Sequence, residues 1–289
     1  MAKLYVVATP IGNLNDVSAR VKNILSSVKL IASEDTRQTL KLLNKFNISA
    51  PLISYHKFNE SQRAEEIINK MLTENVDIAI VSDAGTPAIS DPGAILVKLA
   101  HEHGIEVIAI SGPCALVSAL SVSGLDITEF AFFGFLPRGK NEIEKIFNKI
   151  NLMQIKTFVL YESPLRILNT LKFIKTHFYG CKVSISNDLS KLHERTLCGK
   201  IEDIFNILSN DENAKKGEYV IVVQKNENIK QEKLVVEDYT IEAKLTDIML
   251  KQKCTLKDAQ AVLHTMCPNY SKKDIYTASL NLKKIFRPL

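Results

Sequence analysis

The chain has 289 residues, of which 46% are hydrophobic and 24% are charged, a composition that is typical of a soluble globular protein. No apolar run approaches the roughly 18 residues that cross a bilayer, and Pro10 interrupts the N-terminal stretch too early for a signal peptide. The five cysteines form no CxxC pair and no metal-like spacing with histidine, so we expect reduced thiols and no metal. These features predict a cytoplasmic protein that does not use a membrane.

The net charge of +5 is unevenly distributed along the chain. Residues 1–239 balance 28 Lys and Arg against 28 Asp and Glu, whereas residues 240–289 hold nine basic residues against four acidic ones. A basic appendage on a neutral body favours a polyanionic partner, most often nucleic acid. The alternative is a lysine-rich surface that serves only solubility.

Strands and helices alternate through the first 121 residues. Short apolar runs predict strands over 4–8, 30–32, 51–55, 76–81 and 107–110. Helical apolar spacing follows each of them, most clearly over 17–28, 63–72, 94–104 and 116–121. This alternation predicts a parallel sheet whose ligand face lies at the carboxyl ends of the strands.

The stretch from Val76 to Gly93 carries the strongest local signal. A buried strand breaks into SDAGTPAISDPG, which places two Asp, two Pro and two Gly in twelve residues. The loop is longer than the two to six residues that usually join a strand to a helix. It contains no phosphate-binding glycine motif, so Asp83 favours a cationic or polyhydroxylic ligand. An ordinary strand-to-helix connection is the alternative.

Two further polar clusters follow strands of the same predicted sheet. They are Glu34-Asp35-Thr36-Arg37 and Ser111-Gly112-Pro113-Cys114-Ala115. Each has a plain reading, as an acidic helix start or a turn into a helix. Because parallel strands end at one edge, we expect both clusters and the Asp83 loop to lie together.

The second half of the chain predicts another α/β domain, over residues 116–224. Strands are expected over 130–135, 157–160, 182–186 and 219–223, with helices over 142–150, 165–178 and 201–208. The residues between 187 and Gly199 read as a polar stretch. We therefore expect an N-terminal α/β domain over 1–115 and a second one over 116–224.

A charged, apolar-poor segment over 225–238 reads as a linker to a helical domain over 239–289. Helices are expected over 240–251, 255–266 and 272–285. A short helix, a turn and a last helix that begins with Lys272 and Lys273 resemble a helix-turn-helix. A helical cap that packs on the body or on a dimer partner is the alternative.

Several motifs, taken in order, resemble one known family. They are LYVVATPIGNL, IASEDTRQTLKLL, VSDAGTPAISDPG, ISGPCALVSALSVSGL, FFGFLPRGK and YESP. This set resembles the bacterial ribosomal RNA small-subunit methyltransferase I family, of the tetrapyrrole methylase superfamily. The resemblance covers roughly residues 3–224, and the helical tail resembles the family's small C-terminal domain. It implies 2′-O-methylation of a cytidine in the decoding region of 16S ribosomal RNA, within the small subunit.

The resemblance also implies two α/β domains with S-adenosylmethionine in the cleft between them, and a homodimer. It implies that the donor contacts residues of both domains: Pro10, Asp83, Ala84, Gly85, Thr86, Ile89, Ser111, Gly112, Pro113, Cys114, Ala115, Tyr161, Glu162 and Ser163. Asp83 can pair with the ammonium group or the ribose hydroxyls of this donor. The small residues at 114–115 can admit adenine to the backbone.

The residues expected to meet the RNA depart in part from the family pattern. Leu165 stands where the family commonly has His, and Asn187 stands where it commonly has Arg. Leu165 excludes a polar contact, and Asn187 makes a weaker one than a charge-assisted arginine bond. The residues expected to contact RNA are Arg37, Asn59, Arg138, Lys140, Arg166, Lys272 and Lys273.

A sulfonium donor needs neither a metal nor a covalent nucleophile. The protein then has to align the reacting groups and to provide a base for the hydroxyl proton. The candidate catalytic residues are Glu34, Asp35, His56 and Lys191. His56 also reads as a plain loop histidine. Two other functions stay open at this point: methylation of a small tetrapyrrole-like substrate, and RNA binding without catalysis.

Overall fold

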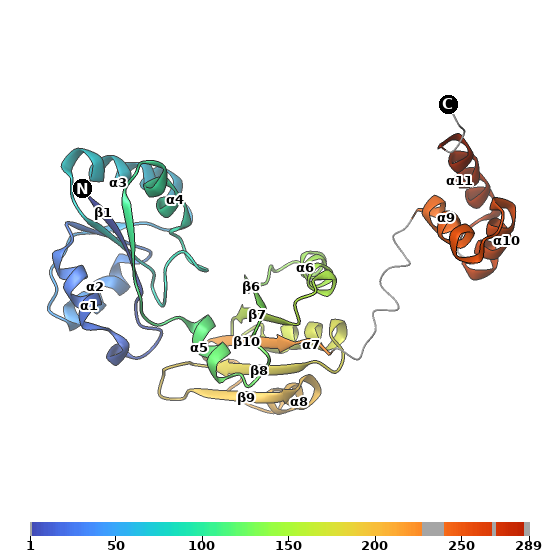
Figure 1. Ribbon diagram of the computed structural model, residues 1–289. Helices are drawn as coiled ribbons and strands as arrows, with labels where there is room; N and C mark the ends of the chain where they lie inside the picture. The colour runs from blue at the N-terminus through green and yellow to red at the C-terminus, as the bar shows by residue number, and fades with distance from the viewer. Residues whose placement is uncertain (1, 227–239, 268–269, 286–289) are drawn as a thin grey trace. The chain divides into compact units, whose positions relative to one another are not determined.

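The computed structural model describes residues 2–226, 240–267 and 270–285. The chain divides into two compact units, residues 1–227 and 228–289, and each unit is considered by itself. Two sheets form the first unit, with three helices in the second (Figure 1). The expected fold class, α/β with two sheets and C-terminal helices, is confirmed. The linker expected over 225–238 lies, from residue 227 onward, outside the described residues.

The first sheet is entirely parallel and has the strand order β3-β2-β4-β1-β5. Its strands are β1 (Lys3–Val7), β2 (Leu30–Ser33), β3 (Leu52–Ser54), β4 (Ile78–Val81) and β5 (Glu106–Ile110). The connecting elements are η1 (Leu14–Asp16), α1 (Ala19–Ser27), α2 (Thr36–Lys45), α3 (Glu60–Glu74) and α4 (Ala94–Glu102).

Helices cover both faces of this sheet, as the buried residues show. Ile78 and Ile80 of β4 pack with α3 and α4, while Ala79 and Val81 pack with α1 and α2 (Figure 1). Alternate residues of a strand face opposite sides, so a strand buried on both sides is apolar throughout. This accounts for the continuous apolar run that precedes the Asp83 loop.

The Asp83 loop folds back against the end of β1. Thr9 and Gly85 exchange backbone hydrogen bonds of 2.8 and 3.1 Å. Gly85 has a φ of +81°, a conformation that glycine adopts without the clash of a Cβ. The hydrogen bonds hold the loop at the carboxyl edge of the sheet.

The second sheet is mixed and has the order β6-β7-β10-β8-β9. β6 and β7 are parallel, and the remaining neighbours are antiparallel. The strands are β6 (Phe130–Phe135), β7 (Thr157–Glu162), β8 (Lys182–Asn187), β9 (Arg195–Lys200) and β10 (Tyr219–Gln224). The helices are α5 (Ala115–Val122), α6 (Lys140–Leu152), α7 (Ile167–His177) and α8 (Ile201–Ser209).

Different helices pack on the two faces of the second sheet. Ile221 and Val223 of β10 face a core formed with α6, α7 and α8. Val220 and Val222 face α5, which packs with Val159 of β7. Because α5 is short and covers only part of its face, the rest of that face is available to line a cavity.

One strand was not predicted from the sequence. β9 (Arg195–Lys200) lies in what reads as a polar stretch ending at Gly199. It is an edge strand paired only with β8, and its side chains are exposed or half-buried. A strand without a buried face has little of the alternation that reveals strands in a sequence.

The C-terminal unit is a helical cluster of α9 (Ile241–Gln252), α10 (Leu256–Met266) and α11 (Lys272–Ile285). Its core consists of Leu245, Ala259, Leu263, Ile275, Ala278 and Leu282. Thr255 and Asp258 form a capping box that starts α10. In the parts of the chain that the structure describes, no helix is both long and apolar enough to cross a membrane.

Candidate active site

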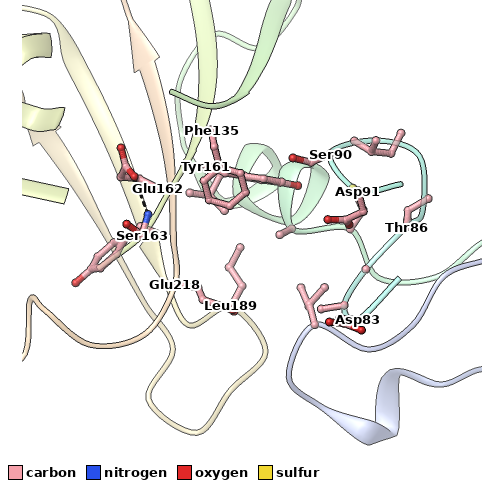
Figure 2. A pocket seen from close by; sticks show the side chains of 18 of the residues that line it. Asp83, Thr86, Ser90, Asp91, Phe135, Tyr161, Glu162, Ser163, Leu189 and Glu218 are labelled. Atoms are coloured by element: carbon pink, nitrogen blue, oxygen red, sulfur yellow. Dashed lines mark hydrogen bonds between the residues drawn. The ribbon is translucent and has the colours of Figure 1, made fainter. Parts of the chain in front are cut away.

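A cavity of about 550 Å³ lies between the carboxyl edge of the first sheet and the α5 face of the second. Figure 2 shows Asp83, Thr86, Ser90 and Asp91 on one side, with Phe135, Tyr161, Leu189 and Glu218 on the other. Its lining is Ile11, Glu34, Asp83, Ala84, Gly85, Thr86, Ile89, Ser90, Asp91, Cys114, Ala115, Phe135, Tyr161, Glu162, Ser163, Pro164, Leu189, Gly217, Glu218, Tyr219 and Val220. The volume suits a ligand of cofactor size.

Three carboxylates line the first wall of the cavity: Glu34, Asp83 and Asp91. Burial raises the pKa of Glu34, and the neighbouring charges of Asp91 and Asp83 raise it further. Burial is also the main reason why the pKa values of Asp83 and Asp91 are raised. A cation in the cavity would relieve this repulsion.

Asp35 stands beside these carboxylates but has a different task. Its side chain caps α2 by accepting from the backbone N–H of Arg37 at 2.9 Å. The Arg37 guanidinium also donates to it, and these bonds lower the pKa of Asp35 to about 2. A carboxylate held in this way is a weak proton acceptor.

Tyr161 connects the second sheet to the first turn of α5. Its hydroxyl oxygen accepts a hydrogen bond of 3.0 Å from the backbone N–H of Leu116. The two phenylalanines of β6 that share its face pack edge-on against its ring, Phe132 at 4.8 Å and Phe135 at 5.6 Å between ring centroids. The Tyr161 side chain is therefore held at its hydroxyl and at its ring, which fixes one wall of the cavity.

The side chain of Glu162 is fully buried and points away from the cavity (Figure 2). It accepts from the backbone N–H of Ser163 at 2.8 Å and from the hydroxyl of Thr170 at 2.5 Å. Arg166 lies 3.4 Å from it and donates to the carbonyl of Pro137 at 2.9 Å. This network holds the loops after β6 and β7 in place.

The loop after β8 meets the first domain near Gly12. Lys191 donates to Asp188 and Glu218, each at 2.8 Å. Burial alone would lower the pKa of Lys191, but these two bonds and charges outweigh it and the pKa is raised. A Cβ on Gly12 would overlap the Lys191 side chain, so the close approach requires glycine.

The cavity as a whole suits a cationic ligand that also has apolar surface. Carboxylates line one wall, and Ile89, Leu189 and Val220 supply apolar contacts. Residues 83–86 bring backbone groups to the cavity without a phosphate-binding glycine motif. Within the described ranges, no group of three or more His, Cys, Asp or Glu side chains is arranged to hold a metal ion.

Comparison with known proteins gives the family. Residues 3–204 match the family model of the Tetrapyrrole (Corrin/Porphyrin) Methylases. Two relatives are both ribosomal RNA small subunit methyltransferase I. The Hydrogenobaculum sp. protein is 43% identical over 80% of this chain and 100% of its own. The Escherichia coli O157:H7 protein is 38% identical over 90% of this chain and 88% of its own.

This chain belongs to the ribosomal RNA small subunit methyltransferase I family. The resemblance noted in the sequence is thereby confirmed. Among solved structures, the uroporphyrin-III C-methyltransferase from Thermus thermophilus complexed with S-adenyl homocysteine has the same fold. It aligns with a TM-score of 0.53 and 14% identity, over 78% of this chain and 97% of the other.

Most of the residues expected to bind the donor in this family member lie around one cavity. Asp83, Ala84, Gly85, Thr86, Ile89, Cys114, Ala115, Tyr161, Glu162 and Ser163 line it. Gly112 and Pro113 line an adjoining hollow of about 560 Å³ that shares Ile11, Cys114 and Leu189 with the first. Pro10 and Ser111 line neither.

The four candidate catalytic residues have different positions and partners in the structure. Glu34 lines the cavity, whereas Asp35 caps a helix and Lys191 is held by two carboxylates. His56 lines neither hollow, and its Nδ1 is buried without a hydrogen-bond partner in the described part of the chain. Of these four candidates, Glu34 alone both lines the cavity and has a raised pKa.

The residues expected to contact RNA have mixed surroundings. Arg138 and Lys140 are exposed in the loop after β6 and at the start of α6, where Lys140 lies 3.8 Å from Glu144. Arg37 is exposed beside Asp35, and Lys272 and Lys273 are exposed at the start of α11.

Two further residues from this set, Asn59 and Arg166, bond to the loops around them. The Asn59 side chain accepts from the backbone N–H of His56 at 2.8 Å and donates to the carbonyl of Ser54 at 3.2 Å. Arg166 bridges Pro137 and Glu162. These bonds make both residues supports of the loops in which they lie.

Sequence reasoning missed several residues that line the cavity. They are Ile11, Ser90, Asp91, Phe135, Pro164, Leu189, Gly217, Glu218, Tyr219 and Val220. Asp91 carried a usable signal, because it lies in the same Asp- and Pro-rich loop as Asp83. Phe135 carried none, because its direction depends on an irregularity in β6.

Proposed function

We propose that this chain is a methyltransferase that uses S-adenosylmethionine to methylate the ribose 2′-oxygen of a cytidine in the decoding region of 16S ribosomal RNA. Its membership of the ribosomal RNA small subunit methyltransferase I family supports the reaction and the substrate. The structural observation that carries the proposal is the cavity lined by Glu34, Asp83 and Asp91. Its acidic wall complements a sulfonium donor that carries positive charge.

The residues present fit this donor. The fit rests on the raised pKa values of the three carboxylates and on the backbone of residues 83–86 in the cavity wall. We assign to donor binding Asp83, Gly85, Thr86, Cys114, Ala115 and Tyr161. When bound, S-adenosylmethionine supplies a methyl group made electrophilic by its sulfonium.

The contribution of the chain is to position the reacting groups and to move one proton. Holding the acceptor oxygen in line with the methyl group is worth roughly 7–11 kcal/mol in well-oriented systems. We assign to Glu34 the role of the base that accepts the proton of the ribose hydroxyl. Its raised pKa makes it a better base than an ordinary exposed carboxylate at neutral pH.

The remaining parts of the proposal concern partners and location. The exposed Arg138 and Lys140 near the cavity, and Lys272 and Lys273 in the C-terminal unit, suit contacts with RNA phosphates. A homodimer belongs to the proposal because the family resemblance implies it, and a cytoplasmic location belongs to it because the cysteine usage favours reduced thiols. The domain boundaries at residues 115 and 224 are also retained as a proposal.

Transfer of labelled methyl groups tests the proposal. Three reactions are compared. Each contains the protein, labelled S-adenosylmethionine and one acceptor, which is small subunits, large subunits or uroporphyrinogen III. We expect label only in the RNA of small subunits that come from cells lacking the enzyme. Label in the tetrapyrrole and none in RNA would overturn the RNA substrate, and donor binding without transfer to any acceptor would overturn catalysis.

A further inference from the structure

A bulge in β6 turns Phe135 into the cavity. Along the pair of strands, Phe132 lies opposite Val159 and Phe135 lies opposite Tyr161. Between these two pairs, β6 has two residues, Phe133 and Gly134, whereas β7 has one, Leu160. The extra residue of β6 is accommodated at Gly134, whose φ is +60°. Without it, alternation would place Phe135 on the same face as Phe133, which packs into the opposite core.

The bulge lies where the second sheet approaches the loop of the first domain. A Cβ built on Gly134 would be 3.5 Å from the Oγ of Ser90, which is van der Waals contact. Figure 2 shows Phe135 beside Tyr161, facing the side of the cavity that carries Ser90 and Asp91. Bulges beside active sites commonly redirect a side chain in this way.

Phe135 is supported on one side and open on the other. Its ring packs edge-on against Tyr161 at an interplanar angle of 64°, and Tyr161 is itself held by Phe132 and by the backbone of Leu116. The residue nevertheless remains 57% exposed, although it lines the cavity. A fixed aromatic ring with open surface at the rim of a cavity is suited to stack against a second flat ring.

The chain that follows Phe135 supplies positive charge at a suitable reach. Arg138 is exposed three residues later, and three residues of extended chain span at most about 10 Å. Arg166 fixes this loop through its bond to the carbonyl of Pro137. An aromatic ring next to basic residues on a braced loop is the combination that binds single-stranded RNA, with bases on the ring and phosphates on the cations.

We propose that Phe135 is the platform on which the base of the target nucleotide, or its immediate neighbour, stacks when single-stranded RNA enters the cavity. The inference rests on the proposed function, because a ribose hydroxyl must reach the cavity for methylation. For methylation, the ribose must lie beside Glu34 and the donor. Its base would then lie toward the rim of the cavity, where Phe135 is exposed. Phe135 is thus assigned to the RNA and not to the donor.

Substitutions that keep the apolar volume but change the ring test this assignment. Phe135→Leu removes the aromatic face, and Phe135→Tyr keeps it. Phe130→Leu is the matched control, because Phe130 is 41% exposed on the same strand but does not line the cavity. For each variant we would measure the Kd for S-adenosylhomocysteine by calorimetry and the Kd for small subunits by filter retention with that product present. Methyl transfer is measured at saturating donor.

We expect Phe135→Leu to weaken subunit binding and lower kcat/KM for subunits by about 5- to 150-fold, the range for loss of one base–aromatic stack. Phe135→Tyr should recover most of this loss, and neither variant should change the Kd for the donor product. Phe130→Leu should match the wild type throughout.

Three results would overturn the inference while leaving the proposed function intact. The first is that Phe135→Leu binds subunits and transfers methyl groups as the wild type does. The second is that either variant raises the Kd for the donor product. The third is that Phe135→Leu and Phe135→Tyr lose equal amounts of subunit binding. Failure of the wild-type protein to methylate small subunits would instead refute the proposed function, so the two failures are distinguishable.

Discussion

The backbone N–H of Asp35 donates a hydrogen bond of 3.0 Å to Oδ1 of Asp83. Asp35 follows β2 and Asp83 follows β4, and these two strands are parallel neighbours that pair Ser33 with Val81. The bond makes the acidic cluster after β2 and the loop after β4 one structural unit. The Asp83 carboxylate therefore both orders the site and contributes charge to it.

Removing the charge of Asp83 separates these two roles. Asp83→Asn keeps an oxygen that can accept from Asp35, so we expect a folded protein. Loss of a charge-assisted bond costs about 1.5–3 kcal/mol, which corresponds to a donor Kd about 10- to 150-fold higher. Calorimetry with S-adenosylhomocysteine measures it. The control is Asp77→Asn, because Asp77 precedes β4 and bonds the backbone of Lys3 at the opposite edge. Equal Kd values for the two variants would contradict the assignment of Asp83.

Glu34 and Asp35 are adjacent carboxylates, and we expect their substitution to affect turnover very differently. Glu34→Gln should lower kcat by about 10²- to 10⁴-fold, the usual contribution of a general base. Asp35→Asn should leave kcat nearly unchanged, because asparagine is an equally good helix cap. Single-turnover methyl transfer to small subunits measures both. If both variants keep full turnover, the cluster after β2 is structural and the base lies elsewhere.

The stability of the ligand-free protein should also depend on the partly buried charge of Glu34. The pKa of Glu34 is raised by burial and by Asp91 and Asp83, so its ionised form destabilises the folded state. Glu34→Gln should therefore raise the melting temperature at pH 8. The gain should shrink as the pH falls and vanish below about pH 4, where the carboxyl is protonated in both folded and unfolded chains. Thermal unfolding at both pH values measures it, and a gain that is independent of pH would contradict this account.

The network around Glu162 predicts a loss of stability on the face of β7 that is turned away from the cavity. Thr170→Val removes the hydroxyl that donates to the buried Glu162 and should cost about 1–3 kcal/mol in the free energy of unfolding. Thr176→Val is the control on the same helix, because Thr176 bonds an exposed carbonyl of its own helix and should change stability by less than about 0.5 kcal/mol. Urea denaturation compares them. Equal losses would mean that the Glu162 network is not stabilising.

Much of the fold could be predicted from the sequence because its signals are local. The strand that ends at Val81 is buried on both faces and therefore apolar without interruption, and the Asp83 loop follows it with dense turn chemistry. Co-location of the clusters at 34–37 and 82–87 followed from the parallel topology alone, which the hydrogen bond between Asp35 and Asp83 bears out.

The features that were missed depend on pairing between distant segments. β9 lies at an edge without a buried face, so its residues show no alternation. Phe135 points into the cavity because of the bulge at Gly134, and Glu162 points away from it because Thr170 and Arg166 lie behind. The sequence offers no local pattern for either direction.

Mapping the transferred methyl group tests the central claim most directly. Small subunits from cells lacking the enzyme are incubated with the protein and labelled S-adenosylmethionine, and their RNA is digested for mass spectrometry. The account predicts one 2′-O-methylcytidine in the decoding region of 16S ribosomal RNA, formed about 10²- to 10⁴-fold more slowly when Glu34→Gln replaces the wild-type protein. A methyl group on a base, on another nucleotide, or no methyl group in RNA despite donor binding would contradict it.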